Sequence, residues 1–453
     1  MNADMFRLCL SAFDPNYNGH MLIHSAGQLL TLAGGPQRGA ALGTLGLVED
    51  GAVLVREGRI TAVGSSAELR AAHPNEATLD ASGRVVLPGF VDAHSHPIWA
   101  GDRAAEFELR LQGKGYLEIL EAGGGILSTV RATRAASLDE LLQQTGPRLQ
   151  RMFAHGSTTI EAKTGYGLDL DTELRMLEAL LRLDDEGPWE LAITFLGAHA
   201  IPSEFKGRAN DYMAELCTAW LPEVERWWET HAGGRPLPFA DAFCETGAFD
   251  LLQTRRILEA AKELGFPLKL HADEFDNLGG VALAVELGAV SVDHVISTSP
   301  KEIAALAASD TVAVALPATP FGLAETHHMP AREILAASGL LAIGGDLNPG
   351  TAWCENLQFT LALACRTLKL TPAQAIAAAT INAAAAISRQ GEVGSIEVGK
   401  QADLLILDVD DYRHLGYRFG TNLVHTVIKK GVLGWQASNN FSVLSPGTGS
   451  SSG

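Results

Sequence analysis

The stretch Leu87-Pro-Gly-Phe-Val-Asp-Ala-His-Ser-His96 decides the fold, because an apolar strand ends there in two histidines one residue apart. Alternate side chains of a β-strand point to the same face, so His94 and His96 can bind one metal ion together. A lone His-x-His pair is a weak signal. Here it begins a long series of alternating strands and helices, which favours a metal site at the end of a strand.

Short apolar strands alternate with helical segments after this stretch. The predicted strands are residues 85–93, 157–162, 191–198, 240–244, 268–271, 290–294, 312–316 and 341–345. The helical segments include residues 138–153, 251–264, 279–287, 301–308 and 331–337. This alternation predicts an α/β protein with a distorted (β/α)8 barrel of the TIM type. The alternative, an open doubly wound sheet, predicts a glycine fingerprint after the first strand, and the sequence has none.

Both ends of the chain are rich in β-strand patterns instead. Residues 51–63 predict a hairpin, and an apolar strand covers Ala402 to Leu407. We expect the two ends to pair into one small β-sandwich domain. The expected division is residues 21–84 with 390–436 for this composite domain, 85–389 for the barrel, and 1–20 and 437–453 for irregular tails.

The composition limits the partners of the protein. Its 453 residues contain 34 Lys and Arg against 53 Asp and Glu, a net charge of −19, which argues against nucleic acid and anionic membranes as partners. The five cysteines are scattered and form no C-x-x-C motif, as is typical of a reducing cytoplasm. We see no signal peptide and no apolar run that would span a membrane. The sequence therefore predicts a cytoplasmic protein.

Polar side chains gather where the predicted barrel strands end, and active groups of such barrels lie at those ends. They are His94, His96, Lys163, Tyr166, His199, Glu245, His271, Glu274, His294, Asp346 and Asn348. Imidazoles with one carboxylate favour Zn²⁺ or iron over Mg²⁺ or Ca²⁺. We expect His94, His96, His271 and Asp346 to bind one ion, with water completing the coordination. The ion would lower the pKa of that water toward neutrality.

Several motifs resemble those of a known family. The stretch that ends at His96 is similar to the first-strand motif of the amidohydrolase superfamily. Glu161-Ala-Lys-Thr-Gly-Tyr-Gly-Leu168, Leu270-His-Ala-Asp-Glu274 and Gly345-Asp-Leu-Asn-Pro-Gly-Thr351 resemble motifs of the imidazolonepropionase family. The resemblance runs from about Met21 to about Trp435. It implies a distorted (β/α)8 barrel with a β-sandwich from both termini. It also implies hydrolysis of 4-imidazolone-5-propanoate to N-formimidoyl-L-glutamate in histidine degradation.

The resemblance also assigns roles to individual residues. The metal ligands of the family fall on His94, His96, His271 and Asp346, which implies one Zn²⁺ or Fe³⁺ ion per subunit. Its remaining active-site histidine falls on His294. Its substrate contacts fall on Arg103, Tyr116, Tyr166, His199, Glu274, Asn348, Gly350 and Thr351. A homodimer that acts on a small anionic heterocycle is implied as well.

Chemical roles follow for the main groups. We expect His294 to polarise the substrate oxygen and Glu274 to move the proton of the attacking water to the ring nitrogen. Asp346 can share the role of base, and the sequence leaves the division between these two carboxylates open. Arg103 is expected to bind the propanoate through two parallel hydrogen bonds. The choice between zinc and iron is also open.

Lys163 bears on the number of metal ions. Some related enzymes bridge two metals with a carboxylated lysine from strand four, whereas Lys163 ends the second predicted strand, so we expect a single ion. Lys163 is expected to pair with Glu161 or Glu245 instead. The adjacent His327 and His328 predict a solvated loop, because neighbouring side chains diverge.

Two other functions stay open. One is a related deaminase that acts on a nucleobase-like heterocycle and shares the His-x-His motif and the strand-eight aspartate. Arg103 argues against it, because a neutral base has no carboxylate for an arginine to bind. The other is a metal-binding barrel without catalytic activity that serves as an assembly scaffold, and the expected set of base, polarising group and anion-binding residue argues against that.

Overall fold

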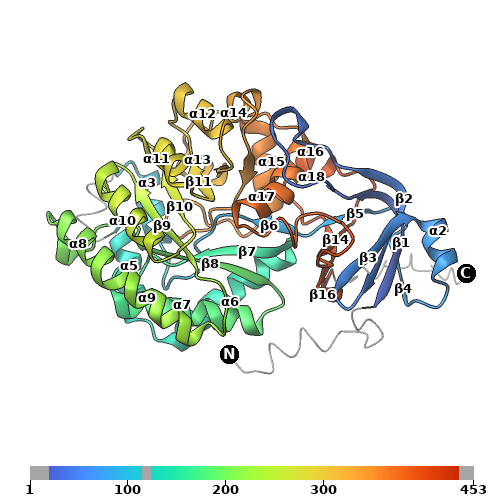
Figure 1. Cartoon of the computed structure of the whole chain (residues 1–453), viewed down its shortest axis with the longest axis horizontal. Coiled ribbons are helices and arrows are strands. Elements are labelled where there is room, and N and C mark those ends of the chain that lie inside the picture. Colours follow the sequence, from blue (N-terminus) through green and yellow to red (C-terminus); the bar gives the residue numbers. More distant parts are fainter. Residues whose placement is uncertain (1–19, 115–123, 438–453) are drawn as a thin grey trace, which may run out of the picture.

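The computed structural model describes residues 20–114 and 124–437 of the chain (Figure 1). Two sheets organise these residues: a parallel sheet whose strands alternate with helices, and a mostly antiparallel sheet made from both ends. Figure 1 shows the second sheet to the right of the barrel, with blue N-terminal and red C-terminal strands together. No helix within the described ranges combines the length and the apolar character needed to cross a membrane.

The parallel sheet is the predicted barrel, and its strand order from β6 to β13 follows the chain. Its strands within the described ranges are β6 (Phe90–Asp92), β7 (Ser157–Lys163), β8 (Glu190–Ala198), β9 (Phe239–Cys244), β10 (Lys269–Ala272), β11 (Ser291–His294), β12 (Val312–Ala315) and β13 (Leu341–Ile343). Beyond β13, the backbone N–H of Asp346 donates to the carbonyl of His94, and that of His96 to Leu347, both at 2.8 Å. These bonds join the last strand to the first, so the (β/α)8 prediction is confirmed.

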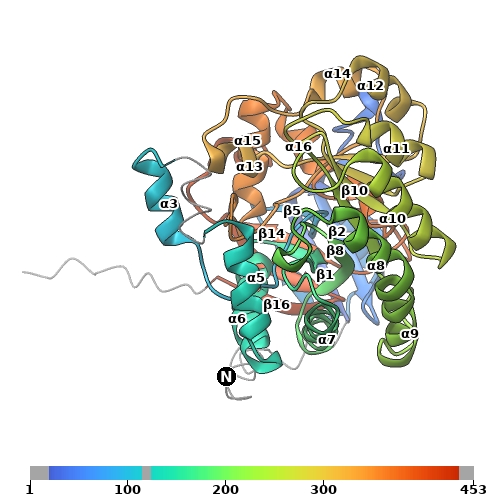
Figure 2. The same ribbon diagram turned by 90° about the vertical axis from the view of Figure 1, so that its left-hand side faces the viewer.

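Helices surround these strands, as Figure 2 shows. Capping boxes begin several of them, for example at Ser137 with Glu140 and at Asp250 with Gln253, where side chains satisfy the first free N–H groups. The main helices around the barrel are α5 (Ile126–Ala135), α6 (Leu138–Ala154), α7 (Leu170–Glu186), α9 (Leu221–His231), α10 (Leu251–Glu263), α11 (Gly280–Leu287), α12 (Pro300–Ala307), α14 (Ala331–Ala336), α15 (Leu357–Thr367), α16 (Pro372–Ala378) and α17 (Ile381–Ala386).

Shorter helices lie in the connections: α2 (Ser66–Ala72), α3 (Ala104–Leu111), α8 (Ala209–Glu215), α13 (Ala318–Leu323) and α18 (His414–Tyr417). Two of them matter for the site. Helix α3 begins directly after Arg103 in the loop that follows β6, and α13 follows β12. Both therefore belong to connections at the C-terminal ends of barrel strands, where side chains of a (β/α)8 enzyme meet the substrate.

The second sheet contains strands from both ends of the chain. In spatial order they are β16 (Val432–Gln436), β15 (Val424–Lys429), β14 (Leu404–Leu407), β5 (Val85–Pro88), β1 (Met21–Leu30), β2 (Leu47–Arg56) and β3 (Arg59–Ser65), while β4 (Thr78–Asp80) pairs with β1. Buried side chains from both halves, among them Met21, Val53, Ile406 and Ile428, share one apolar core. An additional sheet built from both termini is therefore confirmed.

The strand predicted at residues 85–93 is in fact two strands. β5 belongs to the terminal sheet and β6 to the barrel, and the chain changes sheets at Gly89. A Cβ atom at Gly89 would lie 2.2 Å from Oγ1 of Thr158, so the close approach requires glycine. Both strands are buried throughout, which is why the apolar pattern showed no break. In the proposed domain division, β5 therefore belongs to the composite domain rather than to the barrel. The division itself remains a proposal.

Candidate metal centre and active site

The ends of β6, β10 and β13 bring the four expected metal ligands together. His94 and His96 follow β6, His271 lies in β10, and Asp346 follows β13. The Nε2 atoms of His94 and His96 are 3.3 Å apart, and Nε2 of His271 is 3.3 Å from that of His96. Oδ1 of Asp346 lies 3.5 Å from Nε2 of His94 and 3.7 Å from Nε2 of His96. All four residues are buried.

This arrangement has the chemistry of a metal site. Burial lowers the pKa of His94 and of His96 well below the usual value, which favours neutral rings with free lone pairs. Neutral nitrogen atoms that face each other at 3.3 Å repel unless a proton or a cation lies between them. Three imidazoles and a carboxylate are a donor set that suits Zn²⁺ or iron. The residues present therefore fit the expected ion.

Two buried aspartates contact the far side of the histidine rings. Nδ1 of His94 lies 2.7 Å from Oδ2 of Asp293, and Nδ1 of His271 lies 2.9 Å from Oδ2 of Asp241. Carboxylates only accept hydrogen bonds, so these contacts favour a proton on each Nδ1 and leave each Nε2 free for an ion. The sequence analysis did not identify either aspartate.

Lys163 ends the second strand of the barrel, as predicted. Its Nζ is 2.9 Å from Oε1 of Glu161, one of the two partners expected for it. The other expected partner, Glu245, accepts hydrogen bonds from the backbone N–H groups of Phe275 and Asp276 instead. Glu245 thus holds the loop that follows Glu274.

His294 and Glu274 lie beside the histidine cluster. The ring centroid of His294 is 5.5 Å from that of His94 and 5.3 Å from that of His271, and its Nε2 is 3.7 Å from Oε2 of Glu274. Burial, reinforced by the charge of Asp346, raises the pKa of Glu274 well above its usual value. A carboxyl group in such surroundings can hold a proton near neutral pH and release it, as proton transfer during hydrolysis requires.

Left-handed backbone conformations occur at the same strand ends. The φ angles are 75° at His294, 54° at Val295 and 49° at Asp346. A β-branched residue such as Val295 rarely adopts this conformation, which costs roughly 1–3 kcal/mol. The backbone N–H of Val295 donates to the carbonyl of Ala272 at 3.1 Å and helps to hold it. Backbone strain that clusters in this way is typical of functional sites.

Tyr166 and His199 form an aromatic wall next to the cluster. The His199 ring stacks on His96 with centroids 5.1 Å apart, and Tyr166 meets His199 edge-on, also at 5.1 Å. Nδ1 of His199 lies 2.9 Å from the carbonyl oxygen of Gly165, while burial lowers the pKa of His199 to about 3. The ring is therefore neutral. Tyr116, the third expected aromatic contact, lies outside the described residues.

Arg103 and the turn after β13 lie together. Nε of Arg103 donates to Glu106 at 2.9 Å, and a Cβ at Gly350 would come 2.3 Å from Nη1 of Arg103. The side-chain oxygen of Asn348 accepts hydrogen bonds from the backbone N–H groups of Gly350 and Thr351, at 2.9 and 2.8 Å. Asn348 therefore fixes the turn, and the missing side chain at Gly350 leaves room for the guanidinium group.

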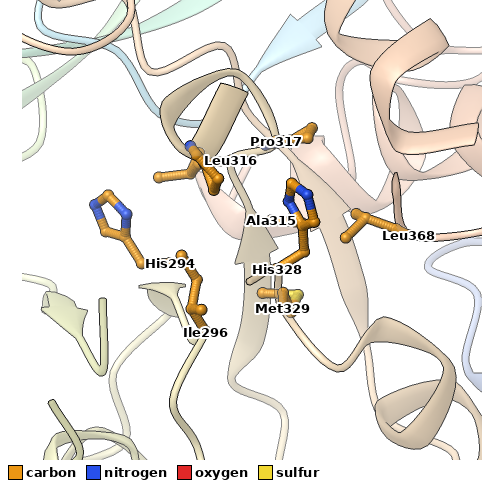
Figure 3. A pocket seen from close by; sticks show the side chains of 9 residues that line it. His294, Ile296, Ala315, Leu316, Pro317, His328, Met329 and Leu368 are labelled. Atoms are coloured by element: carbon orange, nitrogen blue, oxygen red, sulfur yellow. The ribbon is translucent and has the colours of Figure 1, made fainter. Parts of the chain in front are cut away.

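A pocket lined mainly by apolar side chains lies next to His294 (Figure 3). His294 and His328 lie on opposite sides of it, with Leu316 and Met329 also in its lining. His328 is half-buried rather than solvated as expected, whereas His327 is exposed. The apolar lining keeps one side of the His294 environment poor in water, in agreement with the lowered pKa of His294.

Comparison with known sequences places the chain in a family. The amidohydrolase family matches residues 85–434, and the imidazolonepropionase-like composite domain of bacteria matches residues 51–75. An imidazolonepropionase from Herpetosiphon aurantiacus is 51% identical over 410 residues, which cover 90% of this chain and 96% of that protein. One from Chloroflexus aggregans is 50% identical over 415 residues, 91% of this chain and 97% of that protein.

Solved structures share the fold at much lower identity. Guanine deaminase from E. coli has a TM-score of 0.70 and 14% identity, covering 92% of this chain and 99% of that chain. An adenosine deaminase from Xanthomonas campestris, solved with bound zinc, has a TM-score of 0.63 and 21% identity, covering 91% and 92%. Likeness at this level shows the fold alone, whereas the two sequence matches at about half identity span nearly the whole chain. The chain belongs to the imidazolonepropionase family of the amidohydrolases.

Proposed function

We propose that the chain hydrolyses the ring of 4-imidazolone-5-propanoate to N-formimidoyl-L-glutamate, a step of histidine degradation. The observation that carries this proposal is 51% identity to an imidazolonepropionase over 90% of the chain. In the reaction, water adds to the ring carbonyl carbon, the bond from that carbon to the ring nitrogen breaks, and a new carboxylate forms. The deaminase alternative is supported by the shared fold, at 14–21% identity, and by the metal-ligand motifs common to both kinds of enzyme.

The direct test supplies the purified, metal-loaded protein with imidazolone propanoate and, separately, with guanine and cytosine. Because the imidazolone is unstable, formimidoylglutamate is the better readout. We expect formimidoylglutamate from the first substrate and no ammonia from the nucleobases. Ammonia release from a nucleobase without any formimidoylglutamate would favour the deaminase, and no turnover of any of the three would favour a scaffold.

The proposed cofactor is one Zn²⁺ or Fe³⁺ ion per subunit, bound by His94, His96, His271 and Asp346. When bound, such an ion lowers the pKa of a water ligand toward neutrality and polarises a carbonyl group. The spacing of 3.3 Å between Nε2 atoms supports this ligand set. A single ion is supported by Lys163, whose ammonium group lies 2.8 Å from Asp241 and supplies positive charge there.

The residues beside the cluster would move the protons. Glu274 accepts the proton of the attacking water and delivers it to the departing ring nitrogen. His294 donates a hydrogen bond to the carbonyl oxygen as negative charge develops there. The 3.7 Å between these two side chains supports action on one substrate carbonyl. Oδ2 of Asp346 accepts a hydrogen bond from Oγ1 of Thr319 while its Oδ1 faces the histidines, so we assign Asp346 to the metal and Glu274 to the proton transfer.

The substrate tail and ring would have separate binding sites. Arg103 binds the propanoate carboxylate, because a guanidinium group can form two parallel hydrogen bonds with it. Glu106 orients Arg103, and Gly350 leaves space beside its Nη1. Tyr166 and His199 pack against the heterocycle. The turn held by Asn348, with Gly350 and Thr351, offers polar groups to the end of the substrate opposite the propanoate. Tyr116 remains a proposed contact.

Replacing Arg103 with alanine tests the anion site. Loss of a charge-assisted hydrogen bond is worth roughly 1.5–3 kcal/mol, so kcat/KM for imidazolone propanoate should fall by about 10- to 150-fold, mainly through a higher KM. Arg151→Ala is the control, because Arg151 is half-exposed and pairs with Glu355. Steady-state kinetics would contradict the assignment if Arg103→Ala and Arg151→Ala behaved alike.

We also propose a cytoplasmic homodimer with neither nucleic acid nor a membrane as partner. The net charge of −19 supports the exclusion of polyanionic partners. The described cysteines, Cys217, Cys244, Cys354 and Cys365, are free, as suits a reducing compartment. Phe107 and Leu111 on α3 are exposed apolar side chains that a second subunit would cover. Light scattering in solution measures the subunit number, and a monomer would refute the dimer.

A further inference from the structure

Five charged side chains fill the barrel interior behind the histidine cluster. Lys163 and Lys269 lie among three carboxylates, and the side chains of all five are fully buried: Glu161, Lys163, Asp241, Lys269 and Asp293. They come from β7, β9, β10 and β11. Burying charges is costly unless they pair closely. Since none of the five is among the proposed metal ligands or substrate contacts, the cluster needs an explanation of its own.

Lys163 lies where two histidine–aspartate pairs meet. Its Nζ is 2.8 Å from Oδ2 of Asp241, the same oxygen that lies 2.9 Å from Nδ1 of His271. Nζ is also 3.4 Å from Oδ2 of Asp293, the same oxygen that lies 2.7 Å from Nδ1 of His94. A single ammonium group therefore contacts the carboxylate partners of two proposed metal ligands from different strands.

Hydrogen bonds within the barrel fix the other oxygens of both aspartates. Oδ1 of Asp241 accepts from the backbone N–H groups of Ala242 and His271, at 2.8 and 3.2 Å. Oδ1 of Asp293 accepts from the hydroxyl of Ser291 at 2.7 Å. Each carboxylate is thus held at one oxygen by uncharged donors. The other oxygen of each aspartate, Oδ2, faces a histidine. Lys163 is the cation closest to Oδ2 in both aspartates.

The rest of the cluster holds Lys163 itself. Oε1 of Glu161 accepts from Nζ of Lys163 at 2.9 Å and from the hydroxyl of Thr194 at 2.5 Å. Oε2 of Glu161 lies 2.8 Å from Nζ of Lys269, which also donates to the carbonyl of Ala93 at 2.9 Å. Burial alone would lower the pKa of Lys163, but the surrounding carboxylates raise it, so the ammonium group keeps its charge.

We propose that Lys163 is a positioning residue for the metal centre, which holds Asp241 and Asp293 so that His271 and His94 present Nε2 to the ion. Lys163 acts through the two aspartates and does not touch the substrate. Without its charge, Lys269 at 3.9 Å from Oδ2 of Asp293 is the remaining cation of the cluster near these oxygens, and repulsion between the two carboxylates moves them away from the Nδ1 atoms. This inference rests on the proposed metal-dependent function.

The test replaces Lys163 with methionine and measures Zn²⁺ affinity of the metal-free protein by competition with a chromophoric chelator. Partners of ligating histidines typically contribute 10- to 100-fold to metal affinity, so we expect the dissociation constant to rise by about that factor. Lys429→Met is the matched control, because Lys429 is also buried and lies 2.6 Å from Asp403 and 2.8 Å from Glu190. We expect it to lower thermal stability and leave zinc affinity unchanged.

A folded Lys163→Met protein that binds zinc as tightly as the parent overturns the proposal, and so does an equal loss of affinity in Lys429→Met. If Lys163→Met does not fold, Asp241→Asn is the second variant that tests the proposal. It keeps the size of the side chain but removes the charge between Lys163 and His271, so zinc affinity should again fall, and an unchanged affinity refutes the inference. Zinc affinity is independent of turnover. A parent protein that binds zinc without forming formimidoylglutamate therefore refutes only the proposed function.

Discussion

Glu274→Gln is expected to keep the fold and the metal while losing most of the turnover. Glu274 follows the proposed ligand His271 by three residues, and its Oε2 lies 3.7 Å from Nε2 of His294. Glutamine has the same size but cannot accept and release a proton. Because general acid–base catalysis contributes about 10²–10⁴-fold, kcat should fall by about that factor. Steady-state formation of formimidoylglutamate measures it, together with metal content and the thermal midpoint.

A neighbouring carboxylate supplies the control for this variant. Glu325 is exposed, and its charge adds to the field that raises the pKa of Glu274. Because solvent screens this exposed charge, its contribution is small, and Glu325→Gln should leave kcat nearly unchanged. If Glu274→Gln retained its metal and turned over within about threefold of the parent, Glu274 would not be the base, and the role would pass to Asp346.

The barrel and the position of its site were predictable from the sequence because the strands are short and buried. Buried parallel strands form apolar runs, and the run predicted at residues 312–316 corresponds to β12, Val312–Ala315. Polar residues directly after such runs lie at one end of a barrel. For this reason His94, His271 and Asp346, from strands far apart in the sequence, could be grouped before any distance was known.

Features that depend on contacts between distant segments were not predictable. The change of sheet at Gly89 follows from its close approach to Thr158, which no local pattern reveals. The pairing of Lys163 with Asp241 depends on how β7 and β9 align across the barrel. Alternation shows which face a side chain is on, but not what it meets there. The sequence signal that could have pointed to these buried ion pairs was a charged residue inside a short apolar strand, such as Asp293.

Removing the metal is expected to lower turnover as strongly as the Glu274→Gln substitution or more. The proposed role of His94, His96, His271 and Asp346 is to hold an ion that stabilises charge in the transition state by several kcal/mol. At about 1.4 kcal/mol for each factor of ten, turnover should fall by roughly 10³-fold or more without it. The protein is treated with a chelator, dialysed and then reconstituted with Zn²⁺ or iron in separate samples.

The most direct measurement compares formimidoylglutamate formation by stripped, replete and reconstituted protein at equal concentration. Our account predicts negligible product from the stripped sample and full recovery when one ion per subunit is restored, and the ion that restores it distinguishes zinc from iron. Ring opening at the same rate in stripped and replete samples would contradict the account, because the four converging side chains would then have no part in activating water.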